Sequence, residues 1–408
     1  MVTADFYGTS QYVTLELTQQ GDALTGRFAG DKLVGTVHGD TLQFLATGGD
    51  GGTEEARATL AGGAMSGTIV FAKATNPGHP ATHAFTALRS PPRPTRSPQR
   101  HVFTPTAFPR QFSALIAPVL HVAPGDTIAT TTIDAGGTDA KGIERSLGGN
   151  PETGPFFVDG AQPGDTLVIH LVRVRLDRDW AFSNDGIVAR GLDRELAVRM
   201  HDAGQRLRWH LDLPRSIATS EKPGSHLARY QVPLHPMLGC IGVAPPPAVA
   251  GPTTGDSGVW GGNMDFNEVV EGATIYLPVG VPGALLYIGD GHAAQGDGEL
   301  TGTALETSLA VEFSVDLVRG KVAPGPRVES PTHVAAMGLA GSLDDAFRAA
   351  TANMAAWLGD DYELTPSEIA QVLGTAAEYR VTEVADRNAG IVLKIARDRL
   401  RALAPAAK

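Results

Sequence analysis

The first ninety residues alternate apolar and polar positions in short runs that are separated by turn signals. Val13, Leu15 and Leu17 alternate with polar residues, and the dipeptide Gly-Asp recurs at positions 21–22, 30–31 and 39–40. Strict alternation indicates a strand with one buried face, and Gly-Asp pairs are typical of the tight turns between antiparallel strands. We predict that residues 1–90 form a small all-β meander, a module for which the sequence indicates no role.

The pattern between about residue 100 and residue 325 remains that of β structure. Apolar or alternating runs such as "GAQPGDTLVIHLVRVRL" and "TSLAVEFSVDLV" are bounded by Pro and Gly. A proline-rich stretch, 91–99, precedes them, and because proline removes backbone donors we predict a linker there. The catalytic part of the chain is expected in residues 100–408.

Helical patterning begins only at about residue 340. Ser342 is placed as an N-cap, with acidic residues in the first turn and Gly359 at the expected end. A second helix is predicted from Thr365, where Pro366 and Glu368 complete a capping box. We interpret both helices as packing elements, which makes the predicted fold mainly β, with a sandwich-like or barrel-like core and C-terminal helices (α+β).

Composition narrows the function. The 408 residues include 49 Gly and 28 Pro but only 19% charged residues, and the net charge of -11 argues against a nucleic-acid partner. No apolar run approaches the ~20 residues that span a bilayer, so no membrane partner is expected. The first residues lack the features of a signal peptide, so a cytoplasmic location is expected by default, or a periplasmic or secreted one if a signal has been removed. With Cys240 as the single cysteine, any metal must be held by His and carboxylates.

The segment "YIGDGHAAQGDGE" (287–299) combines four ionisable side chains with four glycines. Asp290 and His292 follow an apolar strand and share one face, because residues two apart in a strand point the same way. Asp297 and Glu299 would share a face if that end is also extended. Imidazole and carboxylate ligands suit a divalent cation, and glycine allows close approach of the backbone. The alternative interpretation is a solvated acidic turn.

Three other segments repeat parts of this pattern. In "GGNMDFNEV", Asn263 and Asp265 stand two apart, and Asp134 precedes paired glycines in "TTTIDAGG". His235 precedes a glycine-punctuated apolar run. The recurrence of polar side chains at glycine-rich strand ends favours a shared site more than any one member does.

A serine or cysteine nucleophile is the alternative to a site built from His and carboxylates. The segment "GDSGV" (255–259) resembles the nucleophile loop of trypsin-like proteases, but Val259 replaces the second glycine and no suitable surrounding for a base is found. Cys240 lies in an apolar segment and is predicted to be a buried small hydrophobe. The sequence therefore contains no credible serine or cysteine nucleophile.

At this point the motifs resemble the acetamidase/formamidase family. The resemblance rests on the segments 152–171, 235–245, 261–299 and 302–306 in their order along the chain. It implies hydrolysis of small aliphatic amides to carboxylate and ammonia by a β-rich, homo-oligomeric enzyme that uses metal-activated water. The implied cofactor is a divalent metal, usually zinc, with calcium as the other possibility.

The resemblance and the spacing together lead to a hypothesis for individual roles. The expected metal ligands are Asp134, Asp265, Asp290 and His292. The expected catalytic residues are Glu299 as general base, Asp297 or Glu306 as its substitute, and His235 as a further ligand or oxyanion stabiliser. Two alternatives stay open: the same chemistry on a lactam or larger amide, and a non-catalytic β binding protein stabilised by calcium.

Overall fold

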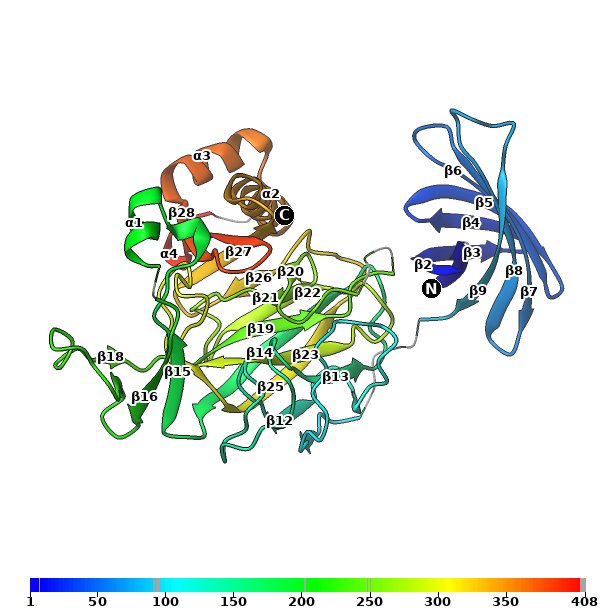
Figure 1. Cartoon of the computed structure of the whole chain (residues 1–408). Coiled ribbons are helices and arrows are strands. Elements are labelled where there is room, and N and C mark those ends of the chain that lie inside the picture. Colours follow the sequence, from blue (N-terminus) through cyan, green and yellow to red (C-terminus); the bar gives the residue numbers. More distant parts are fainter. Residues whose placement is uncertain are drawn as a thin grey trace.

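The computed structural model describes residues 1–6, 8–90, 92, 96–201, 203–247, 249 and 251–403. Of the predicted linker 91–99, the structure describes residue 92 and residues 96–99. Residues 91 and 93–95 lie outside the described part. Three β-sheets account for most of the ordered structure, and the helices gather near the C-terminus (Figure 1). The prediction of a mainly β fold with C-terminal helices is confirmed.

The N-terminal sheet is an antiparallel meander that curls on itself, drawn in blue in Figure 1. Its end strands β2 and β3 are separated in sequence by Thr14 alone, so one continuous stretch of chain pairs with β1 at one end and with β4 at the other. The glycines of the predicted Gly-Asp turns, Gly21, Gly30 and Gly39, all adopt positive φ. The strands are β1 (Val2–Phe6), β2 (Thr9–Val13), β3 (Leu15–Gln20), β4 (Ala23–Phe28), β5 (Asp31–His38), β6 (Thr41–Thr47), β7 (Thr53–Ala61), β8 (Ala64–Ala72) and β9 (Ala81–Leu88).

This sheet has its own apolar core, which includes Phe28, Phe44, Ile69 and Phe85. Contact with the rest of the molecule involves Tyr12, which is partly buried against a second apolar cluster in the main body. The two cores are therefore built from different parts of the chain.

A second nine-stranded sheet forms one wall of the main body. The strand order is β10-β12-β25-β14-β22-β26-β27-β29-β28, and only the β10–β12 pair is parallel. The strands are β10 (Arg100–Val102), β12 (Thr127–Thr131), β14 (Thr166–Leu176), β22 (Thr274–Pro278), β25 (Leu309–Val318), β26 (Arg327–Glu329), β27 (His333–Ala340), β28 (Glu378–Glu383) and β29 (Ala389–Ala396).

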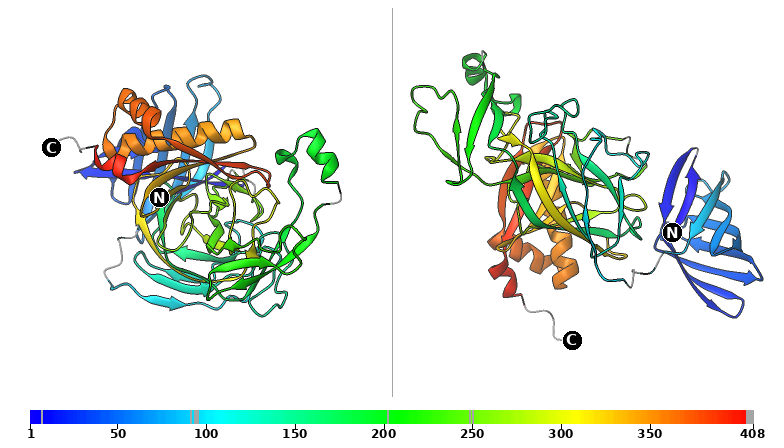
Figure 2. Two further views of the ribbon diagram at one scale, coloured as in Figure 1. Left: turned by 90° about the vertical axis from the view of Figure 1, so that its left-hand side faces the viewer. Right: turned by 90° about the horizontal axis from the view of Figure 1, so that it is seen from below.

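The third sheet has eleven strands and carries most of the candidate chemistry. Its main path runs β18-β17-β16-β15-β24-β23-β19-β21-β20, with β11 and β13 joined through β23. The strands are β11 (Leu120–Val122), β13 (Thr153–Val158), β15 (Trp180–Asn184), β16 (Arg206–Asp212), β17 (Ile217–Ser220), β18 (Val232–Pro233), β19 (Met237–Val243), β20 (Ser257–Gly258), β21 (Gly261–Asn263), β23 (Leu286–His292) and β24 (Glu306–Thr307). The two sheets of the main body share one large core, and their strands curve around it (Figure 2).

The main helices cover the part of the second sheet that contains strands β27 and β29. Helix α2 (Leu343–Tyr362) packs on β27 and β29 and buries Met354 and Trp357. It continues past Gly359 and closes on Glu363 in a left-handed conformation, so the predicted end was three residues short. Helix α3 (Pro366–Ala376) begins with the predicted capping box. Shorter helical elements are η1 (Ala189–Gly191), α1 (Arg194–Arg199) and α4 (Arg397–Arg401).

Candidate active site

Strand pairing in the third sheet creates the centre of the site. Asp290 and His292 end β23, and the antiparallel partner β24 sets Glu306 directly opposite His292. Cross-strand partners on one face have neighbouring side chains. His292 Nε2 accordingly lies 3.3 Å from Asp290 Oδ1 and 3.3 Å from Glu306 Oε1, and all three side chains are buried.

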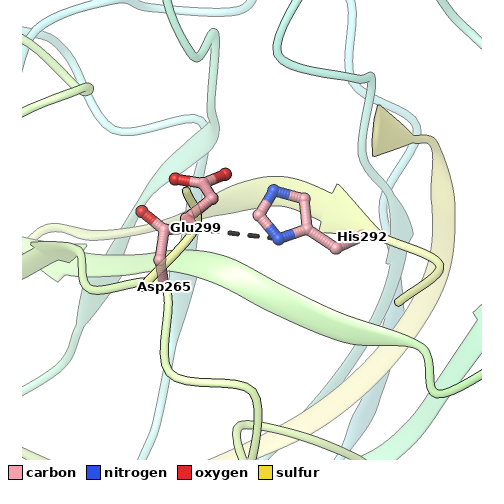
Figure 3. Close-up of side chains that lie close together, drawn as sticks. All are labelled: Asp265, His292 and Glu299. Atoms are coloured by element: carbon pink, nitrogen blue, oxygen red, sulfur yellow. Dashed lines mark ion pairs between the residues drawn. The ribbon is translucent and has the colours of Figure 1, made fainter. Parts of the chain in front are cut away.

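Two loops add further carboxylates (Figure 3). Asp265 follows β21, and its backbone N–H and that of Met264 both donate to Gly239 O. Glu299 lies in the loop after β23, which is held by backbone hydrogen bonds between Gly298 and the segment 381–384. His292 Nδ1 is 4.0 Å from Asp265 Oδ1, and Asp265, His292 and Glu299 form one possible metal-binding group while Asp290, His292 and Glu306 form another.

Backbone strain marks three of these acids. Asp265, Asp290 and Glu299 have φ of 44°, 52° and 45°, in the left-handed region that residues with a Cβ seldom adopt. Each such residue costs on the order of 1 kcal/mol or more, and strain of this kind concentrates at functional sites. The strained positions coincide with the carboxylates that face His292.

The orientation of His292 is fixed by Gln295. The Gln295 amide nitrogen donates to Asp265 O at 2.5 Å and to Thr382 O at 3.2 Å, which leaves its oxygen to accept from His292 Nδ1 at 2.9 Å. The proton of a neutral His292 is therefore assigned to Nδ1, and Nε2 presents its lone pair to Asp290 and Glu306.

Charge in this cluster is poorly compensated. Burial raises the pKa of Asp265 and of Glu299 well above the usual value, and the neighbouring carboxylates add to the shift. Burial alone would lower the pKa of His292, but Glu306 and Asp290 raise it well above its usual value. The cluster therefore has the electrostatics of a cation site.

The donor set fits a divalent metal ion. Within the described ranges, no hydrogen bond reaches Asp265 Oδ1, Asp290 Oδ1, Glu306 Oε2 or His292 Nε2, although all four atoms are buried. Gly239 borders the same space: a Cβ at this position would lie 2.4 Å from Asp290 Oδ2 and 2.5 Å from Asp265 Oδ1. One imidazole nitrogen and several carboxylate oxygens are donors that suit zinc.

A cavity of about 340 Å³ opens over this cluster. Its acidic end is formed by Asp290, Glu299, Glu306 and Asp386, and its other lining residues include Asn150, Phe182, Asn184, Arg206 and Thr303. A reacting molecule could therefore contact the acidic cluster and the outer lining at the same time.

The sequence-predicted residues divide into two sets. The structure brings together Asp265, Asp290, His292, Glu299 and Glu306. The other three predicted residues belong to neither of the two possible metal-binding groups. Asp297 is exposed and forms an ion pair with Arg380, and the His235 side chain is exposed. Asp297 and Glu299 do not share a face, because the chain turns between them instead of staying extended.

Asp134 is engaged elsewhere. Its Oδ2 accepts from Arg178 at 2.7 Å in a fully buried ion pair, and its Oδ1 accepts from the Thr138 backbone at 2.9 Å. The Arg178 guanidinium lies 3.5 Å from the centroid of the Trp180 ring. The contacts of Asp134 are those of a structural carboxylate.

Sequence reasoning missed three contributors to the site. Glu152 is fully buried beside Gly289, and the pKa of its carboxyl is raised by burial and by Asp290. Asp386, in the hairpin between β28 and β29, lines the cavity, and burial raises its pKa to about 6. The third is Gln295. Glu152 is the first residue of the family-like motif 152–171, so the sequence could have indicated it as a site residue. No motif or spacing in the sequence around residue 386 indicated that Asp386 belongs to the site.

Asn263 connects two of the acids. Its amide donates to Asp265 Oδ2 at 2.8 Å and to Asp386 Oδ2 at 2.6 Å, and its oxygen accepts from Asn150 at 2.8 Å. Since Oδ2 of Asp265 is occupied in this way, Oδ1 is the oxygen left facing His292.

Comparison with known proteins matches this part of the chain. The model of the Acetamidase/Formamidase family matches residues 248–337, which contain Asp265, Asp290, His292, Glu299 and Glu306. A formamidase of Methylophilus methylotrophus is 26% identical over 217 residues, 42% of this chain and 52% of that protein. The chain thus matches about half the length of this curated relative.

Two solved structures are similar over most of their length. A predicted acetamidase/formamidase of the thermophile Thermoanaerobacter tengcongensis has 25% sequence identity and a TM-score of 0.63, covering 75% of this chain and 99% of that one. An acetamidase of Bacillus halodurans has 26% identity and a TM-score of 0.63, covering 74% and 99%. About a quarter of this chain has no counterpart in either structure.

Proposed function

Since this chain belongs to the acetamidase/formamidase family, we propose that it hydrolyses small linear amides to a carboxylate and ammonia. The observation that carries the proposal is the buried cluster of four carboxylates around His292, which borders a cavity large enough for a small substrate. Amide hydrolysis requires a nucleophile, a polarised carbonyl and a proton for the leaving amine, and this cluster can support all three.

We propose Asp290, Glu306 and the Nε2 atom of His292 as the residues that would hold a divalent cation. Nε2 is the nitrogen left available by Gln295, and the two carboxylates lie at equal distance from it. Zinc accepts this mixed nitrogen and oxygen donor set, whereas calcium prefers six to eight oxygens. A cation bound there would polarise the amide carbonyl and favour the deprotonated form of water.

Glu299 is the proposed general base. It lines the cavity, and its raised pKa suits a group that accepts a proton near neutral pH and returns it to the leaving nitrogen. Asp297, only two residues away, lies outside the lining and is bound to Arg380. Asn150 and Thr303 line the same cavity and can form hydrogen bonds with a bound substrate.

The test is ammonia release from formamide, acetamide, propionamide and cyclic amides, with and without a chelator. We expect turnover of the linear amides that is lost with the chelator and restored by zinc. Release from the cyclic amides alone would favour a lactam substrate. Stabilisation by calcium without ammonia from any amide would favour a non-catalytic binding protein.

Matched variants separate the roles. Glu299→Gln should lower kcat by about 10²- to 10⁴-fold, the usual contribution of a general base, and Asp297→Asn should change it less than threefold. His292→Ala should lose bound metal, and the exposed His235→Ala should keep it. Full metal content and activity in both His292→Ala and Asp290→Ala would refute the site.

We also propose that residues 1–90 form a module separate from the catalytic part, 100–408. The N-terminal core and the large core of the main body share no residues, which supports this division. A chain that begins at residue 96 should keep metal content and ammonia release within about threefold of the full chain. Loss of bound metal on truncation would show instead that the two parts depend on each other.

A further inference from the structure

The part of the cavity lining without carboxylates differs in chemistry from the acidic part. Besides backbone and small residues, it presents Asn150, Asn184, Thr303, the ring of Phe182 and the guanidinium of Arg206. No Leu, Ile, Val or Met stands among the described residues of its lining. A long aliphatic acyl chain would therefore find, in the described lining, no aliphatic side chain larger than that of Ala135 to pack on, whereas a polar group would find hydrogen-bond partners.

The cavity is also larger than the smallest amides require. At about 340 Å³ it falls in the range of pockets that enclose ligands well above the size of acetamide. Glycines 136, 148 and 149 are among its lining residues and leave room for a substrate. A Cβ at Gly136 would lie 3.2 Å from Asp134 Oδ1, 3.5 Å from the Phe182 ring and 3.6 Å from an Arg206 nitrogen.

Arg206 is held in place but has no carboxylate partner among the described residues. Its Cζ lies 3.5 Å from the centroid of the buried Phe182 ring, a stacked arrangement that fixes the plane of the guanidinium. Next on the same face of β16, Arg208 likewise lies over an aromatic ring, but it forms an ion pair with Glu221 at 2.9 Å. Arg206 is the only Arg or Lys in the described lining of the cavity.

We infer that the site takes short amides that carry a carboxylate at the end remote from the amide, and that Arg206 binds this carboxylate. The inference rests on the proposed function and adds a substrate class to it. Arginine presents several N–H donors in one plane, which matches the two oxygens of a carboxylate. The reactive amide then lies at the acidic end, with the negative tail kept away from Asp290, Glu299 and Glu306.

The experiment compares monoamides of dicarboxylic acids with the corresponding diamides, in a series from oxamate through malonamate and succinamate to glutaramate. Each pair has the same length and differs by one negative charge. For the best-fitting member, we expect kcat/KM of the acidic amide to exceed that of the diamide by at least tenfold. The advantage should shrink as salt concentration rises, because the contact is partly exposed.

The matched variants are Arg206→Gln and Arg208→Gln. Arg206→Gln should lower kcat/KM for the acidic amide by about ten- to a hundredfold, mainly through KM, and change that of the diamide less than threefold. Arg206→Lys should restore part of the loss, and Arg208→Gln should leave both substrates unaffected. Binding of each amide is also measured by calorimetry on the metal-loaded protein, so that affinity is read separately from turnover.

The outcomes distinguish a failure of this inference from a failure of the proposed amide hydrolysis. Hydrolysis of neutral amides with no preference for the acidic ones, or an equal loss for both substrates in Arg206→Gln, would overturn the inference and leave amide hydrolysis standing. Ammonia from no amide would overturn the proposed function. In that case, tighter calorimetric binding of succinamate than of succinamide, lost in Arg206→Gln, would still support the carboxylate contact, and equal binding would refute it.

Discussion

Gly239 gives the sharpest test of the site, because it lies between two of the carboxylates. An alanine Cβ at this position would lie 2.4 Å from Asp290 Oδ2, 2.5 Å from Asp265 Oδ1 and 2.9 Å from His292 Cε1. Ordinary contacts begin at about 3.4 Å, so the carboxylate oxygens would have to retreat by roughly 1 Å. The glycine itself has an ordinary strand conformation, and the substitution therefore acts through contact alone.

The acids have little freedom to yield. Asp265 is anchored by its backbone hydrogen bond to Gly239 O and by Asn263, and Asp290 is held inside the strand β23. Metal sites tolerate changes in ligand distance of only about 0.2 Å, and a 1 Å misplacement at a reacting centre costs about a hundredfold. We expect Gly239→Ala to lose metal affinity, to lower kcat/KM at least a hundredfold and to cost about 1–3 kcal/mol of stability.

Gly296→Ala is the matched control. Gly296 lies in the loop that carries Glu299, has no positive φ, and its Cβ would meet nothing within 4 Å. Metal content by mass spectrometry, ammonia release and urea unfolding are measured on both variants, and the control should stay within twofold of the wild type. Wild-type metal content and kcat/KM in Gly239→Ala would refute the placement of the site.

Other expected outcomes concern residues around the cluster. Gln295→Met should weaken metal binding by about ten- to a hundredfold in calorimetry, because it frees the ring of His292; unchanged affinity would contradict that role. Asp134→Asn should lower the free energy of urea unfolding by about 3–5 kcal/mol by leaving Arg178 buried without its partner, yet keep full metal content; loss of metal would restore Asp134 as a ligand. Burial alone would raise the pKa of Asp126, but its hydrogen bonds hold that pKa far below the usual value. The ionised Asp126 therefore stabilises the folded protein fully above about pH 4, and this stabilisation is lost as the pH falls. Asp126→Asn should lower the free energy of urea unfolding by about 1–3 kcal/mol at pH 7, and this deficit should shrink toward pH 2. A deficit independent of pH would contradict this account.

Local patterns predicted the elements well because their causes are local. The alternation in residues 1–90 and the Gly-Asp turns correspond to strands and hairpins, and the capping box at Thr365 begins α3. Gly359 did not end α2, since nothing there requires the left-handed conformation that Glu363 adopts four residues later. A glycine permits a helix end but does not impose one.

Described residues also include no helix long and apolar enough to cross a membrane.

Local patterns in the sequence predicted the mainly β fold and the strand ends where ionisable residues gather, and its motifs resemble those of the acetamidase/formamidase family. The two-residue period of a strand was enough to set Asp290 and His292 on one face. It could not tell Glu299 from Asp297, because the backbone turns between them and a distant segment, 381–384, holds that loop.

Which charged groups come into contact depends on the folded arrangement of distant segments. Arg178 pairs with Asp134, and Asp386 enters the cavity from a hairpin more than ninety residues beyond His292. Such contacts depend on strand register and on packing between sheets, which no local spacing encodes. These contacts matter because the neighbours of a buried carboxylate set its charge state and its role. A carboxylate paired with an arginine has a structural role, whereas one that lies with other carboxylates around an imidazole is a candidate metal ligand.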